Sequence, residues 1–189
     1  GSNPLAGKYV DVNDIKVYYE IYGEGEPLLL LHGNSGSIKA GEYQIPALSK
    51  HFKVIAIDSR AQGRTTDSDK EITYALMASD MSELIDKLNL GKVNVVGWSD
   101  GGNIGLELAY AHPEKVLKVV AFGANYTNEN WMASPDSVVM NPDDPLIIKT
   151  SAMMKRYITS LARLSPDTLR IPIIKKKLED LTTKYPNFT

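Results

Sequence analysis

The sequence contains no cysteine and only three histidines among its 189 residues. The absence of cysteine excludes a disulfide framework, a thiolate zinc site and a cysteine nucleophile. No apolar run approaches the ~18 residues of a membrane-spanning helix. The formal net charge of −2 gives no electrostatic reason to expect a nucleic acid or an anionic membrane as a partner. We expect a cytoplasmic location, although Gly1-Ser2 resembles a cloning scar and a leader could have preceded it.

The pattern of apolar runs predicts an α/β protein. Two β-rich stretches joined by Asn13-Asp14 predict an antiparallel hairpin. Buried strands and helices then alternate, which is typical of a mostly parallel sheet covered on both faces. The strands are expected at residues 9–12, 15–22, 28–31, 53–57, 92–96 and 116–122, and the helices at 42–50, 73–90 and from Ser99 to about 111.

The character of the chain changes near residue 125, where proline and polar residues replace the strand pattern. Two helical patterns follow, at about 145–163 and 166–184, and no further strand is indicated. We therefore expect residues 1–125 to form an α/β core and residues 126–189 to form a helical lid. Side chains of the lid either shape an apolar pocket or simply pack against the core; they are Trp131, Met140, Met153 and Met154.

Residues 93–102 read as an apolar strand that enters Gly97-Trp98-Ser99-Asp100-Gly101 and then a helix. Gly-x-Ser-x-Gly in this context predicts a nucleophile elbow, in which a sharp strand-to-helix turn exposes the serine hydroxyl. The glycines leave room where a Cβ would clash. Ser99 is therefore the candidate nucleophile.

A second buried strand ends in His32-Gly33, which would place the next residues beside the elbow. We expect the backbone N–H of Asp100 and that of Asn34, or of Ser35 beside it, to form an oxyanion hole. The Asp100 carboxylate has two interpretations. Either it is simply stabilised by the helix dipole, because it stands in the first turn of a helix, or it holds a substrate ammonium group.

Four side chains are predicted to contact the substrate. They are Asp100, Ser35, Trp98 and Tyr126.

The order of these segments resembles the α/β-hydrolase fold family. The match includes residues 58–64, which follow that family's Asp-x-Arg-x-x-Gly pattern, and covers residues 8 to about 126. Within the family, residues 97–102 and 122–125 resemble the biphenyl-hydrolase-like (valacyclovir hydrolase-type) branch. The resemblance implies a serine hydrolase of carboxylic esters, including amino-acid esters or amides, that forms an acyl-enzyme and needs no cofactor or metal. Asp58 and Arg60 are expected to fasten the loop that contains them.

The resemblance also implies an acid and a histidine after the serine, in that order, but the last histidine in this sequence is His112. A helix rise of 1.5 Å per residue places it about 20 Å from Ser99, and His51 lies about 15–20 Å away at the other edge of the sheet. His32 is expected to make a structural hydrogen bond. Glu129 or Asp136 could replace the acid but not the base.

We therefore expect a chain that is catalytically incomplete and truncated before the last strands of the family fold. The strand at 116–122 would then form an unpaired edge, open to a second copy or to a complementing C-terminal fragment. Two other functions are considered. One is a non-catalytic protein of this fold that binds a ligand or partner. The other is a nicotinamide-dependent oxidoreductase, which residues 33–36 disfavour because Gly-x-x-Gly is not Gly-x-Gly-x-x-Gly.

Overall fold

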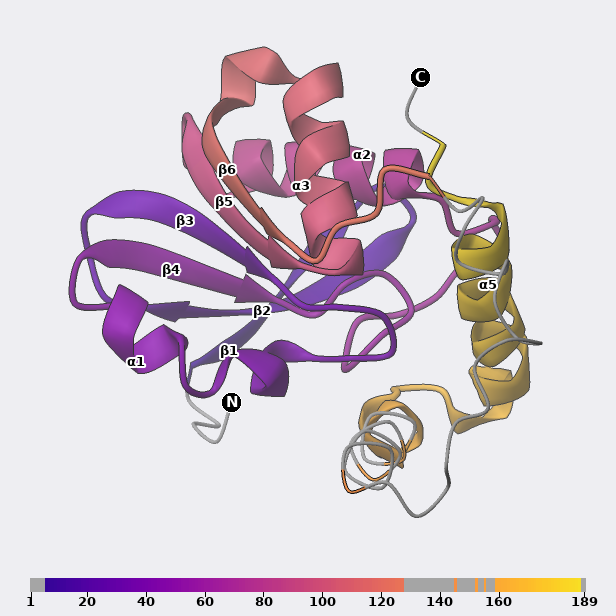
Figure 1. Ribbon diagram of the computed structural model, residues 1–189. Helices are drawn as coiled ribbons and strands as arrows, with labels where there is room; N and C mark the ends of the chain where they lie inside the picture. Colours follow the sequence, from indigo (N-terminus) through magenta and orange to yellow (C-terminus); the bar gives the residue numbers. More distant parts are fainter. Residues whose placement is uncertain (1–5, 128–144, 146–151, 153–154, 156–158, 188–189) are drawn as a thin grey trace.

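The computed structural model describes residues 6–127, 145, 152, 155 and 159–187 (Figure 1). Its centre is a six-stranded sheet with the strand order β1-β2-β4-β3-β5-β6. β1 and β2 form an antiparallel hairpin, β2 pairs antiparallel with β4, and the remaining neighbours are parallel. The predicted mostly parallel sheet with an N-terminal hairpin is confirmed. The strands are β1 (Gly7–Val12), β2 (Ile15–Tyr22), β3 (Glu26–Leu31), β4 (Phe52–Ile57), β5 (Val93–Trp98) and β6 (Val116–Phe122).

Helices cover the two faces of the sheet unequally (Figure 1). α2 (Tyr74–Lys87) and α3 (Asp100–Ala111) lie on one face, where Leu29 and Leu31 of β3 join the larger core cluster. The short η1 (Ile38–Gly41) and α1 (Ile45–Leu48) lie on the other face, against Leu28. Successive residues of β3 therefore serve opposite cores, as the pleat requires.

The boundaries of α2 follow from local signals. The Thr73 side chain caps its start by accepting from the Leu76 N–H at 3.0 Å. Met77 and Met81 are fully buried, and Gly91, at φ +68°, follows the end of the helix. The helix predicted for 73–90 is thus confirmed. The one predicted for 42–50 shortens to α1, because Pro46 stands in its first turn and residues before it form a turn.

In the C-terminal part, the structure describes a helix over residues 159–164, the turn η3 (Thr168–Arg170) and α5 (Ile171–Lys184). These fall within the two predicted helical patterns. α5 stands beside the carboxyl ends of the central strands (Figure 1). The division into a core and a lid stays a prediction. Several residues named above lie outside the described residues, namely Trp131, Met140, Met153, Met154, Glu129 and Asp136.

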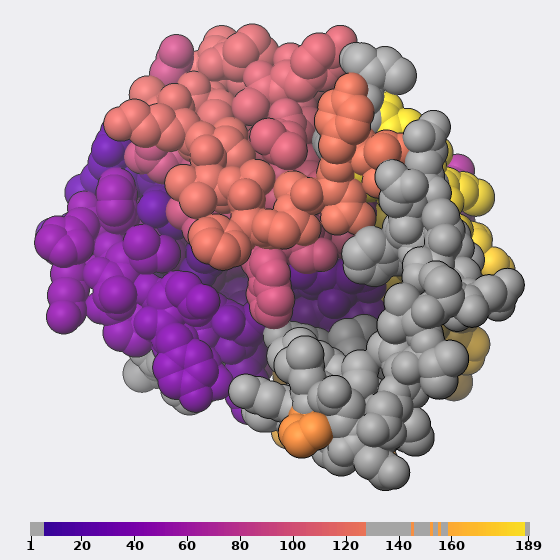
Figure 2. Space-filling view, viewed as in Figure 1, coloured from indigo at the N-terminus to yellow at the C-terminus, as the bar shows by residue number. Residues whose placement is uncertain are grey.

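β6 forms one edge of the sheet, and no described strand pairs with its outer side. Its apolar residues are unusually exposed, with Val120 at 50% and Phe122 at 71%. Figure 2 shows the salmon-coloured residues of β6 and the following loop uncovered over much of this face. Exposed apolar strand edges are sites where another strand can pair.

Candidate active site

The backbone at Ser99 has the geometry of a nucleophile elbow. Its φ of +54° and ψ of −120° lie in a region that non-glycine residues rarely adopt. A Cβ on Gly97 would lie 2.1 Å from the Gly101 oxygen, and one on Gly101 would lie 2.4 Å from the Leu31 oxygen. The Ser99 N–H donates to the Phe122 oxygen at 2.7 Å. The two glycines and the end of β6 therefore hold the serine in this strained turn.

Ser99 lines a cavity of about 590 Å³, within the range of small-molecule sites. Four of the predicted site residues, Asn34, Ser35, Trp98 and Asp100, line it as well. One wall comes from α5, far away in the sequence. The α5 residues are Lys175, Leu178, Glu179 and Thr182.

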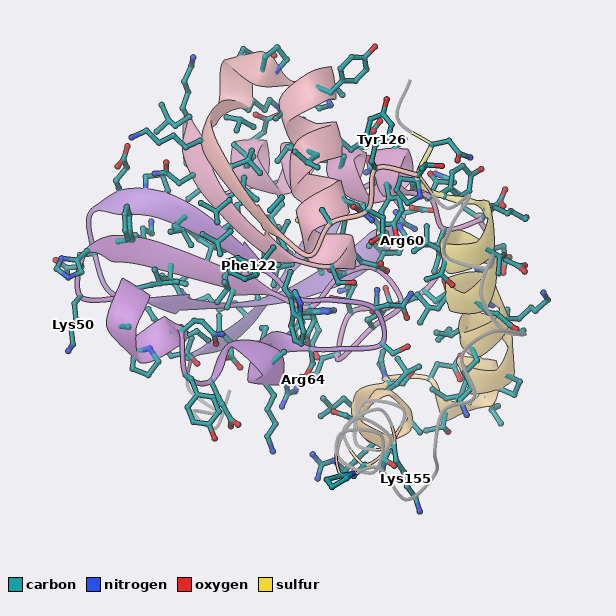
Figure 3. All side chains as sticks on the ribbon, viewed as in Figure 1. Lys50, Arg60, Arg64, Phe122, Tyr126 and Lys155 are labelled. Carbon is teal, nitrogen blue, oxygen red and sulfur yellow. The ribbon has the colours of Figure 1, made fainter. Side chains whose placement is uncertain are left out.

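Tyr126 is a correction to the sequence prediction. It is 71% exposed and does not line the cavity, whereas its neighbour Asn125 does. The Asn125 N–H donates to the Asn103 side-chain oxygen at 3.0 Å. This bond from α3 fixes the loop so that Asn125 lines the cavity and Tyr126 is turned to the surface (Figure 3).

Two backbone N–H groups beside Ser99 remain available. A Cβ on Gly33 would lie 3.2 Å from the Ser99 Cβ, so the end of β3 closely approaches the elbow. Among the described residues, neither the Asn34 N–H nor the Asp100 N–H has an acceptor. The donors of an oxyanion hole must be unoccupied before the reaction, and these two N–H groups meet that condition.

The Asp100 side chain is only 5% exposed. Its Oδ1 accepts from the Tyr74 hydroxyl at 2.8 Å, and its Oδ2 has no partner among the described residues. Burial raises the pKa of Asp100, and the side chains of Tyr74 and Asn34 beside it only partly offset this. Burial and the Asp100 carboxylate likewise raise the pKa of Tyr74. Sequence reasoning missed Tyr74, because nothing local to the start of α2 indicates a partner 26 residues away.

His32 makes the expected structural bonds. Its Nε2 accepts from the Ser59 N–H at 3.0 Å, so the proton lies on Nδ1, which donates to the Gly33 oxygen at 2.7 Å. Both ring nitrogens are therefore occupied. His112 follows α3, and His51 is exposed; neither lines the cavity. No histidine of this sequence is placed to take a proton from Ser99.

The wall formed by α5 is held by an ionic clasp that the sequence did not reveal. We use this name for Asp67, Arg170 and Lys177. The Asp67 carboxylate, whose side chain is 1% exposed, accepts from Arg170 Nη2 at 2.8 Å and from Lys177 Nζ at 3.1 Å. Closer to Ser99, the Asn34 side-chain amide donates to the Leu178 oxygen at 3.3 Å. Both contacts fix α5 over the cavity.

Comparison with known proteins agrees with this geometry. A family model described as "alpha/beta hydrolase fold" matches residues 26–164. The chain belongs to the alpha/beta hydrolase fold family. Among curated members, it is 33% identical over 121 residues to 2-hydroxy-6-oxo-6-(2'-aminophenyl)hexa-2,4-dienoic acid hydrolase of Metapseudomonas resinovorans, covering 62% of this chain and 42% of that protein. It is 38% identical over 111 residues to a soluble epoxide hydrolase of Corynebacterium sp. (strain C12), covering 57% and 38%.

A solved member of the alpha/beta hydrolase fold, an N-acyl homoserine lactone degrading enzyme, aligns with a TM-score of 0.66 at 23% identity. The alignment covers 96% of this chain and 73% of that chain, and it supports the fold alone. The chain spans about two-fifths of the length of the curated relatives described above. Across the described part of the chain, no helix is long and apolar enough to cross a membrane. No group of three acidic or histidine side chains there could hold a metal ion.

Proposed function

We propose that the protein is a serine hydrolase of carboxylic esters, including amino-acid esters or amides, that acts through an acyl-enzyme on Ser99. The observation that carries this proposal is the strained Ser99 turn, which borders a cavity beside two N–H groups without acceptors. The Ser99 hydroxyl would attack the acyl carbon, and a base would take its proton. The N–H groups of Asn34 and Asp100 would stabilise the resulting oxyanion. The leaving group would then depart, and water would release the acid.

The Asp100 carboxylate is proposed to recognise a substrate ammonium group. Its Oδ1 is already bonded to Tyr74, whereas its Oδ2 lacks a described partner. An ammonium group would satisfy this oxygen and offset the cost of keeping the ionised form buried. This assignment supports amino-acid esters or amides as a substrate class.

The base is proposed to come from outside these 189 residues. His32 has no free nitrogen, and the other two histidines do not line the cavity. A serine hydroxyl without a base is a weak nucleophile at neutral pH. We therefore expect this chain alone to turn over esters poorly.

Labelling with a fluorophosphonate probe, followed by peptide mass spectrometry, tests the role of Ser99. Added imidazole serves as an external base. We expect an adduct confined to Ser99 whose rate of formation rises with imidazole. Ser99→Ala should abolish the adduct, and Ser79→Ala, a matched serine of α2 outside the cavity, should leave it unchanged. An absence of any adduct at Ser99 in the presence of imidazole would contradict the proposal.

The missing base also favours a second function, in which the cavity binds a ligand without turning it over. Such a protein would retain a bound ester intact even with imidazole present. Mass spectrometry of the recovered ester distinguishes the two functions, because the hydrolase releases the free acid and the binding protein does not.

A further inference from the structure

The buried carboxylate of Asp100 is held by a tyrosine from another helix. The Tyr74 side chain is 4% exposed, and its hydroxyl donates to Asp100 Oδ1 at 2.8 Å. Tyr74 is the first residue of α2, whose start is fixed by the Thr73 cap, and Asp100 is the first residue of α3. The bond therefore joins the first turns of two helices, and both residues line the cavity beside Ser99.

The other carboxylate oxygen of Asp100 is left without a hydrogen bond. Oδ2 is buried and has no partner among the described residues. Asn34 lies near the carboxylate, but its side-chain amide donates to the Leu178 oxygen of α5 at 3.3 Å. A ligand in the cavity thus meets a carboxylate with one oxygen satisfied by Tyr74 and the other unsatisfied. Burying an unsatisfied anionic oxygen is unfavourable, so a cationic group of a ligand would bind at Oδ2.

The hydroxyl of Tyr74 is the main group that favours the ionised form of Asp100. Burial raises the pKa of Asp100, and the hydrogen bond from Tyr74 is the largest of the effects that lower it. His32 would act in the same direction when protonated, but its ring is neutral in the tautomer described above. From α5, Lys175 and Glu179 line the same cavity, and these exposed side chains are opposite in charge.

We propose that Tyr74 is a positioning residue for the recognition of a primary ammonium group. Its hydroxyl holds Asp100 Oδ1 and favours the ionised carboxylate, while Oδ2 stays available to the ammonium group of an amino-acid ester or amide. An arginine or lysine in place of Tyr74 would neutralise the carboxylate and compete with that ligand, whereas a neutral hydroxyl leaves the negative charge in place. This inference rests on the proposed function for the role of Asp100.

The test compares L-alaninamide with isobutyramide, which has a methyl group where the first has its ammonium group. Both are titrated by ¹⁵N NMR into the 189-residue chain carrying Ser99→Ala, at pH values from about 4 to 7, below the pKa of an α-amino group. We expect alaninamide to bind about tenfold more tightly near the upper end, and its affinity to fall as Asp100 becomes protonated. Tyr74→Phe should move the midpoint of that fall about one pH unit higher, because a hydrogen bond to a charged group changes its proton affinity about tenfold.

Tyr18→Phe is the matched control. Tyr18 is 7% exposed and its hydroxyl donates to the buried Glu20 carboxylate at 2.7 Å, but it does not line the cavity. This variant should leave the midpoint unchanged, and Asp100→Asn should remove both the preference for alaninamide and its dependence on pH.

Three outcomes overturn the proposal: an unchanged midpoint in Tyr74→Phe, an equal shift in Tyr18→Phe, or equal binding of the two amides by the parent chain. The binding measurements involve no reaction at Ser99. Their failure would therefore leave fluorophosphonate labelling of the natural chain unaffected, and a failure of that labelling would leave the binding result standing.

Discussion

Removing the Arg60 side chain should destabilise the fold more than removing any surface cation. Arg60 is 1% exposed. Its Nε and Nη2 donate to the two oxygens of Asp80 at 2.7 Å each. Nη2 also donates to Asp14 at 2.8 Å, and Nη1 to Ser68 at 3.0 Å. One guanidinium thus joins the β1–β2 turn, α2 and the loop after β4, as the sequence interpretation of Arg60 as a fastening residue predicted (Figure 3).

The expected cost follows from what Arg60→Met leaves behind. The Asp80 side chain is 0% exposed, and its remaining bond is from Asn13 at 2.8 Å. Leaving one partner of a buried ion pair uncompensated costs about 3–5 kcal/mol, a large part of the roughly 5–15 kcal/mol of a typical domain. Burial lowers the pKa of Arg60, but the bonds to Asp80 and Asp14 outweigh this and leave it raised. Arg60 is therefore charged at every pH of the assay.

Urea unfolding measures the free energies. In the double variant Arg60→Met/Asp80→Leu no charge is left stranded, so it should recover much of the loss. Lys16→Met is the matched control, because it breaks an ion pair to Asp11 in which the two side chains are 65% and 79% exposed. That change should cost at most about 1 kcal/mol. The reasoning is refuted if Arg60→Met costs no more than Lys16→Met, or if the double variant is no more stable than the single one.

Two further predictions concern the cavity. Asp67→Asn removes the charge that holds Arg170 and Lys177, so amide hydrogen exchange in α5 should accelerate. The control is Glu71→Gln, whose pair with Lys184 is about half exposed, and it should change the exchange little. Equal acceleration in both variants would contradict the role of the ionic clasp. Burial raises the pKa of Asp100 above its ordinary 3.8, so the folded state binds this proton more tightly than the unfolded state. Stability should therefore fall as the pH rises from 3.8 through the raised pKa. Asp100→Asn should flatten that part of the profile of Tm against pH, and identical profiles would show that Asp100 does not contribute.

The features that the sequence predicted well are those with local signals. The glycine spacing around Ser99 and the apolar run of β5 are adjacent in the chain, and together they specify the elbow. The Thr73 cap and the spacing of the apolar residues likewise located α2. The ionic clasp has no such signal, because Asp67 and Arg170 are 103 residues apart. An acidic loop residue and a basic helix residue are also common on any surface.

The sequence located the loop that borders the cavity, but which residue of that loop faces the cavity was harder to predict. Asn125 and Tyr126 both follow β6, but the bond from Asn125 to Asn103 decides which of them borders the cavity. Such a choice depends on one contact with α3, 22 residues away. The tautomer of His32 was fixed in the same manner, by a Ser59 N–H from the loop after another strand.

Because His32 is held in this tautomer by its hydrogen bond, the base for Ser99 has to be sought elsewhere, and the open edge of the sheet at β6 is the place we consider. Recruiting His32 as a base would break its bond with the Ser59 N–H, and Ser59 is 1% exposed. A buried donor left unsatisfied costs about 1–3 kcal/mol, which makes His32 a poor source of the base. The Ser99 N–H is bonded to the end of β6. A strand paired in parallel with the outer side of β6 would therefore end beside Ser99, because parallel strands share a carboxyl edge, where ligands bind in open α/β sheets. We expect the polypeptide that covers this edge to be the one that carries the base.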